Sequence, residues 1–520
     1  MAIDINETSN EIMMMAQMKV PCIMIDNDNF VRWWPSITKC MQQSDFIAID
    51  LELSGLGSKD IFASQIDERY KAIRNAAITR SILSMGIACY KIDSNNGYFK
   101  QRKSNNDDEH KLIMEQIADC LEADDELSND SFNKKTDEET NDKIQFHTNV
   151  NVFHFLTLNH TEFVMETRSM KFLVQQGFDF NELSIKGIPF YPGNDGSSNE
   201  SSSSSSSSSS KSQQPSLRRL IELLISLKLP LLLHNGFIDL AFLYHNFYAE
   251  IPTKLETFMA DLTEMFPNGI FDTKYIAVAH LSCSYLEYLF QYAQRSNYFR
   301  KLKNSLHMVL KFDHYDDQSD IRIFDLSPKI MQHTTNNGYN GGAASGVSKI
   351  CEPYSKYGWC EKADRCELSH NIDLILDEEL RSQRNSKSKQ LIDQLLQIQQ
   401  SNQDLGDNST INNNDNNNNS DEQINCEMTK EPLHKKIGLH HAGNDAFMTG
   451  YYFIYNLITN HKLLANIKEF RKLNELSRYK NKIFLSSKPR PLNVMKSAYN
   501  KCSKGHREKL ANIKKKYNLT

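Results

Sequence analysis

The feature that most constrains this chain is the apolar run FIAIDLEL at residues 46–53, which carries two carboxylates. Its length and composition are those of a buried strand, and the turn-like SGLG at 54–57 follows it. Asp50 and Glu52 are two positions apart, so a strand directs both side chains to one face. Two neighbouring carboxylates away from water repel each other and lose hydration, which requires a cation between them or a shared proton. A solvated strand end is the alternative interpretation of this pair.

Helix-like and strand-like segments alternate along the chain around this run. We predict helices over 29–44, 216–229, 237–247 and 444–459. We predict further strands over 78–92, 149–158 and 230–234. This order indicates an α/β fold in which helices flank a mixed sheet.

Three stretches are too polar to bury the apolar surface that would offset their ordering entropy. They are residues 103–143, in which 110–122 can form a short amphipathic helix, residues 193–215 around ten consecutive Ser, and the Asn-rich residues 400–425. We expect surface insertions here, in agreement with a hydrophobic content of only 39%. No apolar run reaches membrane-spanning length and no signal-peptide core is evident, so we expect a soluble intracellular protein.

A third carboxylate follows the strand predicted at 230–234. Asp239 falls in the first turns of the next helix, for which Asn235 is a plausible N-cap. Functional sites in open α/β sheets lie at the carboxyl ends of strands, where such a helix begins. The alternative is that Asp239 only complements the helix dipole.

A fourth carboxylate, Asp445, opens the helix predicted at 444–459, in the segment GLHHAGNDAF. A carboxylate at a helix start can ligate a metal. His440 precedes Asp445 by five positions and can swing over the same site from the preceding loop. His441 is adjacent to His440 and is the competing candidate.

Asp50, Glu52, Asp239 and Asp445 with His440 match the Asp-Glu-Asp-Asp-plus-His pattern of 3′→5′ exonucleases. The segments DFIAIDLELSGLG, HNGFIDL, FPNGIFDTKYIA and HAGNDAFMTG resemble, in the same order, those of the poly(A)-specific ribonuclease (deadenylase, DEDDh) family. Segments at 69–91, 172–190 and 284–290 are similar to the nuclear branch of that family, which carries a CCCH finger. The resemblance covers most of residues 20–350 and 430–460. One departure is His441, since the family usually has Glu after the catalytic His.

The resemblance implies an RNase H-like exonuclease fold with two Mg²⁺ ions at the site. Asp50, Glu52 and Asp445 would hold one ion. Asp50 would bridge to the second ion, which Asp239 would bind directly or through water. Two such ions can stabilise both the attacking and the leaving oxygens of an in-line displacement, which would release a nucleoside 5′-monophosphate from the RNA 3′ end. His440, with an unperturbed pKa of about 6.5, would take the proton of the attacking water.

A cysteine cluster lies in CEPYSKYGWCEKADRCELSH at 351–370. Cys351, Cys360, Cys366 and His370 supply three thiolates and one imidazole, a set suited to a closed tetrahedral Zn²⁺ site. The spacing resembles that of CCCH fingers that bind single-stranded RNA. Tyr357 and Trp359 lie between the first two ligands. They can stack on RNA bases, or alternatively pack the small domain around its metal.

The C-terminal segment is strongly basic. Residues 462–516 contain seventeen Lys and Arg against three Glu, in a chain whose net charge is −5. A basic tail suggests contact with nucleic acid or nuclear import, with a solvated helical tail as the alternative. We expect its removal from residue 486 onward to weaken RNA binding at low salt and to reduce nuclear accumulation, while sparing cleavage of saturating substrate.

The motifs divide the chain into seven expected segments. They are an N-terminal segment (1–27), the first part of the exonuclease domain (28–335), a flexible tether (336–346), the CCCH zinc finger (347–375), a linker (376–431), the last exonuclease motif and helix (432–461) and the basic tail (462–520). The finger is thus expected to lie inside the nuclease domain, before its final motif.

We therefore expect a nuclear, Mg²⁺-dependent 3′→5′ exoribonuclease that removes 3′ adenosines and releases 5′-AMP, with trimming of small nuclear RNA ends as one possible role. The alternatives are a catalytically silent RNA-binding adaptor and a 3′→5′ DNA exonuclease. The intact set of four carboxylates argues against the adaptor, and the CCCH finger argues against the DNA enzyme. Analogy at the level of the fold does not choose among RNA substrates.

Overall fold

The computed structural model describes residues 18–93, 145–193, 214–281, 283–302, 305–315, 318–327, 350–362, 365–382, 441–459 and 474–519. The chain divides into two units, one of residues 17–104, 134–375 and 438–520 and the other of residues 1–16, 105–133 and 376–437. Of the second unit, the structure describes residues 376–382, which end helix α14 (Ile372–Ser382). The elements below belong to the first unit.

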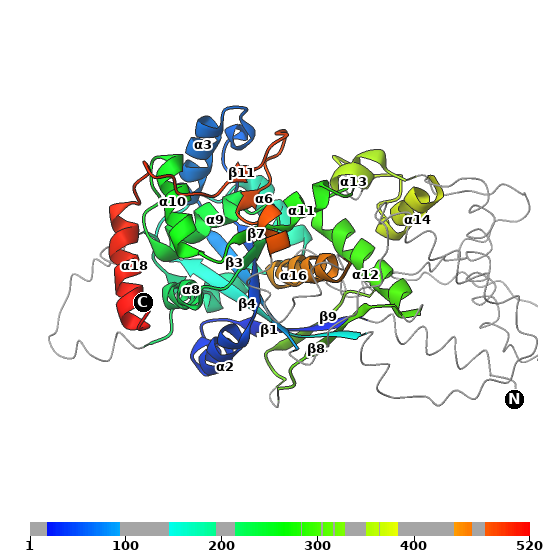
Figure 1. Ribbon diagram of the computed structural model, residues 1–520, viewed down its shortest axis with the longest axis horizontal. Coiled ribbons are helices and arrows are strands. Elements are labelled where there is room, and N and C mark those ends of the chain that lie inside the picture. Colours follow the sequence, from blue (N-terminus) through cyan, green and yellow to red (C-terminus); the bar gives the residue numbers. More distant parts are fainter. Residues whose placement is uncertain are drawn as a thin grey trace, which may run out of the picture. The chain divides into compact units, whose positions relative to one another are not determined.

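Eleven strands of the described residues form one mixed sheet (Figure 1). Its path runs β11 (Leu492–Asn493), β10 (Lys482–Ile483), β7 (Ile270–Asp272), β6 (Leu231–Leu233), β2 (Phe46–Leu53), β3 (Ile82–Ile92), β4 (Gln145–Asn159), β1 (Lys19–Ile25) and β9 (Ile321–Asp325), while β5 (Ile188–Phe190) and β8 (His307–Phe312) also pair with β4. Strands β2, β6, β7 and β10 run parallel, so their carboxyl ends share one edge of the sheet. Strand β3 is antiparallel to both β2 and β4.

The two faces of β2 explain why the sheet is covered on both sides. Ile47, Ile49 and Leu51 are buried in a cluster with residues of five helices: α2 (Phe30–Gln43), α3 (Ile66–Thr79), α8 (Leu217–Leu227), α9 (Phe237–Leu243) and α10 (Leu255–Met265). The alternate residues face helix α16 (Ala442–Thr459), where the rings of Phe46 and Phe453 are 5.4 Å apart. Helix α12 (Leu286–Leu302) packs on α16 in turn (Figure 1).

The same unit contains further helices and helical turns. They are η1 (Lys59–Phe62), α6 (Thr167–Gln175), α7 (Phe180–Lys186), the π-helical turn η3 (Tyr244–Tyr248), α11 (Thr273–Val278), α13 (Glu352–Tyr357), η6 (Asn474–Arg478) and α18 (Lys504–Lys516). Among the described residues, no helix combines the length and the hydropathy that a membrane span requires.

The predicted helices and strands are largely confirmed, including the mixed α/β sheet flanked by helices. The strand predicted over 78–92 begins only at Ile82, because the preceding residues end α3. The helix predicted over 237–247 is α9 followed by the π-helical turn. Strand β1 was not predicted, and it places the start of the sheet at Lys19 rather than at the expected boundary of residue 28.

Several sequence-based expectations lie outside the described residues. They concern the insertions 103–143 and 400–425, most of 193–215, the tether 336–346, the linker beyond residue 382 and the start of the C-terminal segment at 462–473.

The C-terminal segment is not separate from the nuclease domain over residues 474–519. Strand β10 extends the sheet beside β7, with Lys482 opposite Phe271. Ile483, Val494 and Ile513 are each 1% exposed within the main buried cluster. The sequence did not indicate this packing, because these apolar residues are widely spaced among Lys and Arg.

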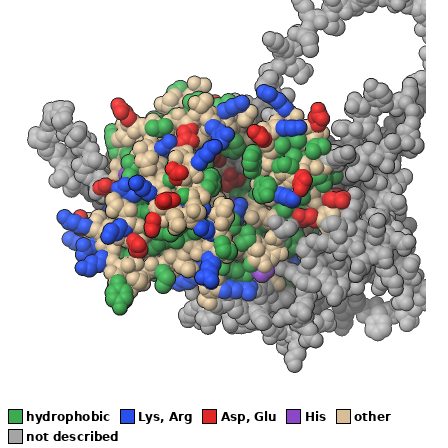
Figure 2. Space-filling model, turned by 90° about the horizontal axis from the view of Figure 1, so that it is seen from above, with side chains coloured by type: hydrophobic (Ala, Val, Ile, Leu, Met, Phe, Trp, Pro, Cys, Tyr) green, Lys and Arg blue, Asp and Glu red, His purple; other side chains and the backbone are tan. Residues whose placement is uncertain are grey.

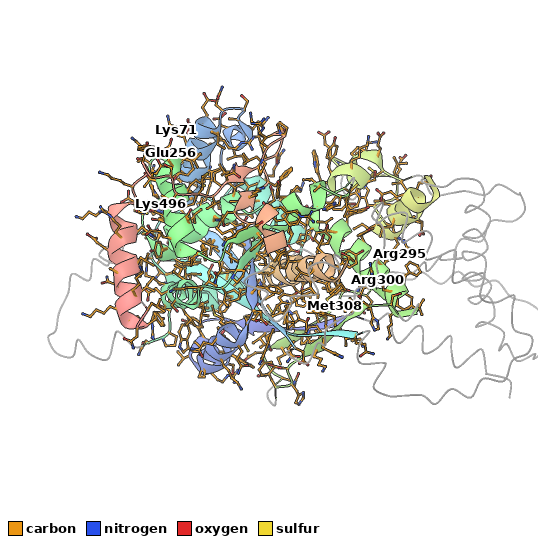
Figure 3. All side chains as sticks on the ribbon, viewed as in Figure 1. Lys71, Glu256, Arg295, Arg300, Met308 and Lys496 are labelled. Carbon is orange, nitrogen blue, oxygen red and sulfur yellow. The ribbon has the colours of Figure 1, made fainter. Side chains whose placement is uncertain are left out.

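The outermost helix, α18, is held by a buried charge. Glu222 on α8 accepts hydrogen bonds from Lys509 (2.9 Å) and Lys516 (2.7 Å) of α18. Lys496 likewise pairs with Glu264 of α10 at 2.6 Å, and Figure 3 labels Lys496 between α10 and α18. Part of the basic character is therefore neutralised within the fold. Removal of residues 486–520 would take Val494 and Ile513 from the buried cluster and destabilise the domain. We therefore expect the truncated protein to lose cleavage activity, whereas the sequence alone suggested that it would keep it.

Candidate active site

Asp50 and Glu52 lie near the carboxyl end of β2, on the face covered by α16. They are in register with Gly86 and Ser84 of the antiparallel neighbour β3. The strand period predicted this shared face, because residues two apart point the same way. The two carboxylates thus project toward the start of α16.

Gly86 allows α16 to approach the sheet closely at this point. A Cβ on Gly86 would lie 1.8 Å from the carbonyl oxygen of Ala442 and 2.5 Å from the amide nitrogen of Gly443. Any larger residue would push the first turn of α16 away from β3. Asp445 lies in this first turn, and its amide donates to the carbonyl of His441 at 3.0 Å. The close contact therefore brings Asp445 to the strand that carries Asp50.

The structure brings three of the predicted carboxylates together, and the charge of the fourth, Asp239, acts on Asp50. One oxygen each of Asp50, Glu52 and Asp445 lie within 4.8 Å of one another. Burial, followed by the charges of Asp445, Asp239 and Glu52, raises the pKa of Asp50 well above its ordinary value. Burial is also the main cause that raises the pKa of Asp239 to about 7. Figure 2 shows a hollow in the face seen from above, with acidic side chains visible inside it.

This cluster has the donor chemistry of a hard-cation site. The three carboxylates that raise the pKa of Asp50 repel its charge, and a divalent cation would remove that repulsion. The buried strand alone would not need Asp50 or Glu52. The residues present therefore fit an oxygen-liganded metal such as Mg²⁺.

The two adjacent histidines differ in what the structure describes. His440 lies outside the described residues. The ring of His441 stacks on His154 of β4, with centroids 3.6 Å apart, and lies 4.8 Å from the ring of Phe324. Burial lowers the pKa of His441 to about 3, so this imidazole remains neutral. His441 packs the start of α16 against the sheet.

The loop that follows β2 is held by residues that the sequence did not single out. Glu166 accepts the amide of Gly57 at 2.8 Å and Nε of Arg80 at 2.7 Å. Ser54 donates its hydroxyl to the carbonyl of Val164 at 2.7 Å and accepts the amide of Ser81 at 2.9 Å. No sequence signal pointed to Glu166, because it lies about 110 positions from the loop that it holds. These contacts fix the end of the strand that carries Glu52.

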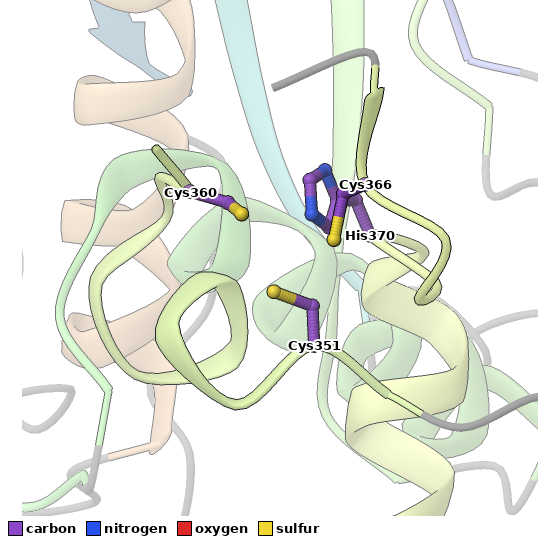
Figure 4. A group of neighbouring side chains, drawn as sticks. All are labelled: Cys351, Cys360, Cys366 and His370. Atoms are coloured by element: carbon purple, nitrogen blue, oxygen red, sulfur yellow. The ribbon is translucent and has the colours of Figure 1, made fainter. Parts of the chain in front are cut away.

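The four finger residues also converge. One ligand atom each of Cys351, Cys360, Cys366 and His370 lie within 4.8 Å of one another, and Figure 4 shows the three sulfur atoms turned toward a common centre. Nε2 of His370 is buried and has no hydrogen-bond partner among the described residues. Its ring stacks on Tyr354, with centroids 4.3 Å apart and planes 6° apart. An unpartnered imidazole nitrogen beside three thiols fits a soft tetrahedral metal site.

Tyr357 and Trp359 are 67% and 64% exposed. They therefore do not form the interior of the finger, which was one of the two interpretations of the sequence. Tyr354 has that packing role instead, through its stack on His370. The sequence offered no reason to prefer Tyr354, since three aromatic residues lie between the first two cysteines.

The finger is docked on the start of α12. The hydroxyl of Tyr354 donates to Glu287 at 3.2 Å, and the thiol of Cys283 donates to the carbonyl of Ser355 at 3.1 Å. Gly358 has φ of +73° and lies against the ring of Tyr285, which leaves no room for a Cβ. Arg295, labelled in Figure 3, donates to the carbonyl of Asp373 at 3.4 Å. The finger thus contacts the same helix that packs on α16.

The fold and the site define a class of protein: an α/β domain with a carboxylate cluster of the kind that metal-dependent nucleases and phosphatases use. The chain belongs to the CAF1 family of ribonucleases, since the CAF1 family ribonuclease profile matches residues 25–217 and 195–453. This membership supports exoribonuclease activity.

Three solved structures are similar to parts of the chain. The structure of S. pombe Pop2p in its Mg²⁺- and Mn²⁺-bound form has 14% identity, covers 58% of this chain and 98% of that one, and has a TM-score of 0.32. The RNase domain of the yeast Pop2 protein has 13% identity, coverages of 54% and 84%, and a TM-score of 0.31. A chain from the yeast NOT1 MIF4G domain co-crystallised with CAF1 has 12% identity, coverages of 50% and 71%, and a TM-score of 0.28.

Proposed function

We propose that the protein is a Mg²⁺-dependent 3′→5′ exoribonuclease of the deadenylase type, which removes 3′ adenosines and releases 5′-AMP. The observation that carries the proposal is the cluster of Asp50, Glu52, Asp239 and Asp445 in a chain of the CAF1 ribonuclease family. A silent adaptor would have no use for four carboxylates that repel one another. Family membership favours RNA over the DNA alternative.

The carboxylates would hold the metal. Asp50, Glu52 and Asp445 are close enough together to share one ion, and the charge of Asp239 also acts on Asp50. When bound, Mg²⁺ would supply charge neutralisation at the scissile phosphate. The protein positions these carboxylate oxygens through the carboxyl end of β2 and through the close approach of α16 at Gly86.

A proton must leave the attacking water. His440 is the proposed acceptor, because an unperturbed imidazole, with a pKa of about 6.5, can take a proton near neutral pH. His441 is unsuited to this part, since its buried ring stacks on His154 and contacts Phe324.

We further propose that Cys351, Cys360, Cys366 and His370 bind one Zn²⁺, and that exposed Tyr357 and Trp359 stack on RNA bases. The order of motifs, with the finger before the final His-Asp motif, favours the nuclear branch represented by the target of early growth response protein. Nuclear location, trimming of small nuclear RNA ends and preference for poly(A) belong to this proposal. Docking of the finger on α12 supports a fixed path from finger to catalytic cluster.

Purified full-length protein is expected to shorten RNA with a 3′ oligoadenosine tail, one nucleotide at a time, in Mg²⁺ but not with chelator. The matched DNA should be cleaved much more slowly, and RNA ending in another nucleotide should be intermediate or resistant. Denaturing gels and chromatography of the released nucleotide would measure this. Failure to cleave any RNA would favour the adaptor, and equal cleavage of DNA would favour the DNA exonuclease.

Two adjacent variants provide the control for the assigned proton acceptor. His440→Ala should lose roughly 10²–10⁴-fold in rate if His440 is the general base. His441→Ala should lose much less, because its stack on His154 is a packing contact. A larger loss at His441 would overturn this assignment.

Cys366→Ser is expected to abolish zinc binding by the finger. Removal of one of four ligands leaves too few donors for a closed tetrahedral site. Denatured wild-type protein should release about one zinc ion per chain to a colorimetric chelator, and the variant should release almost none. Cys40→Ala, which removes a thiol on α2, is the control and should retain the zinc. Equal zinc content in wild type and Cys366→Ser would refute the assignment.

A further inference from the structure

One more buried carboxylate lies beside the catalytic cluster, and it makes different contacts. Asp272 ends β7 and is 1% exposed. Its Oδ1 accepts the amides of Asn235 and Lys274, each at 2.9 Å, and the amide of Tyr275 at 3.4 Å. Its Oδ2 accepts the amide of Phe484 at 2.9 Å. These four backbone donors hold both oxygens of Asp272, and Asp272 is not in the group of Asp50, Glu52 and Asp445.

The contact with Asn235 controls how α9 begins. Asn235 has φ of +58°, a left-handed conformation that is uncommon outside glycine. The N-cap of α9 is Gly236, not Asn235 as expected from the sequence, and glycine has no side chain that could cap the helix. The bend before α9 is therefore held from outside, by the hydrogen bond from the Asn235 amide to Asp272.

The residue after Asp272 adds to this restraint. Thr273 is fully buried, and its hydroxyl lies 3.0 Å from Nδ1 of His234 and 3.2 Å from the carbonyl of Leu233. The end of β7 thus contacts three consecutive residues at the end of β6. Asp239, in the first turn of α9, follows only four positions after Asn235. The position of Asp239 therefore depends on contacts that β7 makes.

We propose that Asp272 is a positioning residue that fixes Asp239 for metal binding by holding the turn between β6 and α9. The inference rests on the proposed function, because it assigns Asp272 to the metal centre of that reaction. The carboxylate also joins β7 to the C-terminal segment through Phe484. The charge of Asp272 contributes to the raised pKa of Asp239, which agrees with their proximity.

The test is Mn²⁺ binding to RNA-free, full-length protein, measured by the loss of the free-ion paramagnetic resonance signal. Asp272→Asn keeps the shape of the side chain but replaces one acceptor oxygen by a donor, which then faces a backbone amide. The variant is expected to bind Mn²⁺ about 10–100-fold more weakly, the usual effect of removing an outer-shell partner. Thr273→Val, a milder change, should weaken binding in the same direction.

Asp179→Asn is the matched control. Asp179 accepts the amides of Asn181 and Glu182 at the start of α7, so the variant makes the same substitution at a backbone-bonded carboxylate away from the turn before α9. It should keep wild-type Mn²⁺ affinity even if its unfolding temperature falls as much as that of Asp272→Asn. Wild-type affinity in both Asp272→Asn and Thr273→Val, or an equal loss in Asp179→Asn, would overturn the proposal.

Asp50→Ala distinguishes this inference from the proposed function. If Asp50→Ala binds Mn²⁺ like wild type, the metal centre itself is wrongly assigned. If Asp50→Ala loses Mn²⁺ while Asp272→Asn keeps it, only the positioning role of Asp272 fails.

Discussion

Asp50→Asn is expected to abolish hydrolysis and, without metal, to raise the thermal stability of the protein at neutral pH. Burial and the three neighbouring carboxylates raise the pKa of Asp50 in the folded state. The unfolded chain loses this proton near pH 4, whereas the fold retains it to higher pH. Ionisation of Asp50 therefore costs the metal-free fold about 1.4 kcal/mol for each unit by which the pKa is raised.

The difference in stability between Asp50→Asn and wild type should depend on pH. Below about pH 4 the carboxyl is protonated in both states, so wild type and Asp50→Asn should differ little there. The advantage of the variant should grow as pH rises toward the raised pKa of the folded state. Thermal unfolding with chelator at pH 4 and pH 7.5 would measure it. With Mg²⁺ the advantage should shrink or reverse, because the ion neutralises the wild-type cluster.

Asp67→Asn is the control, since Asp67 is exposed in the first turn of α3. It should keep full activity and change the free energy of unfolding by less than about 0.5 kcal/mol at both pH values. Hydrolysis by Asp50→Asn at the wild-type rate would refute the metal assignment. A stability gain that is the same at both pH values would refute the electrostatic explanation.

Replacement of both lysines that contact Glu222 is expected to destabilise the nuclease domain by about 3–5 kcal/mol. Burial alone would raise the pKa of Glu222, but the hydrogen bonds from Lys516 and Lys509 hold it below its ordinary value. In Lys509→Ala/Lys516→Ala the carboxylate would remain largely buried without these partners. Denaturant unfolding followed by circular dichroism would measure the loss.

Lys514→Ala/Lys515→Ala removes the same charge from the same helix and is the matched control. Both lysines are exposed, so the free energy of unfolding should change by less than about 0.5 kcal/mol. The two double variants should weaken RNA binding similarly if only the charge of α18 contributes. Equal stability of the two double variants would contradict a structural role for Glu222.

The site could be predicted from the sequence where the information was local. The period of two along β2 placed Asp50 and Glu52 on one face, and the helix start placed Asp445 at an end of α16. The close approach of α16 to the sheet could not be predicted from the sequence, because it depends on the absence of a side chain at Gly86. Asp272 was inside a recognised segment, yet only the fold reveals that its partners come from the turn after β6 and from the C-terminal segment.

The packing of the C-terminal segment could not be predicted from its composition. Its charge density suggested a tail, because a composition count gives the same weight to exposed and buried lysines. Lys509 is 8% exposed and pairs with a residue that is 287 positions earlier in the chain. Ile513 contributes to the core from a helix that is mostly polar. Such long-range pairing is invisible to any window along the sequence.

The amide of Phe484 that Asp272 accepts comes from almost the end of the chain, 212 positions later. Ribosomes synthesise a chain from its N-terminus at roughly 5–20 residues per second. Asp50 and Asp239 are therefore synthesised long before Phe484, whose amide binds Asp272. A nascent chain therefore carries Asp50, Glu52 and Asp239 for many seconds before Phe484 is available to bind Asp272. Pairing across so long an interval also predicts slow folding of the released chain.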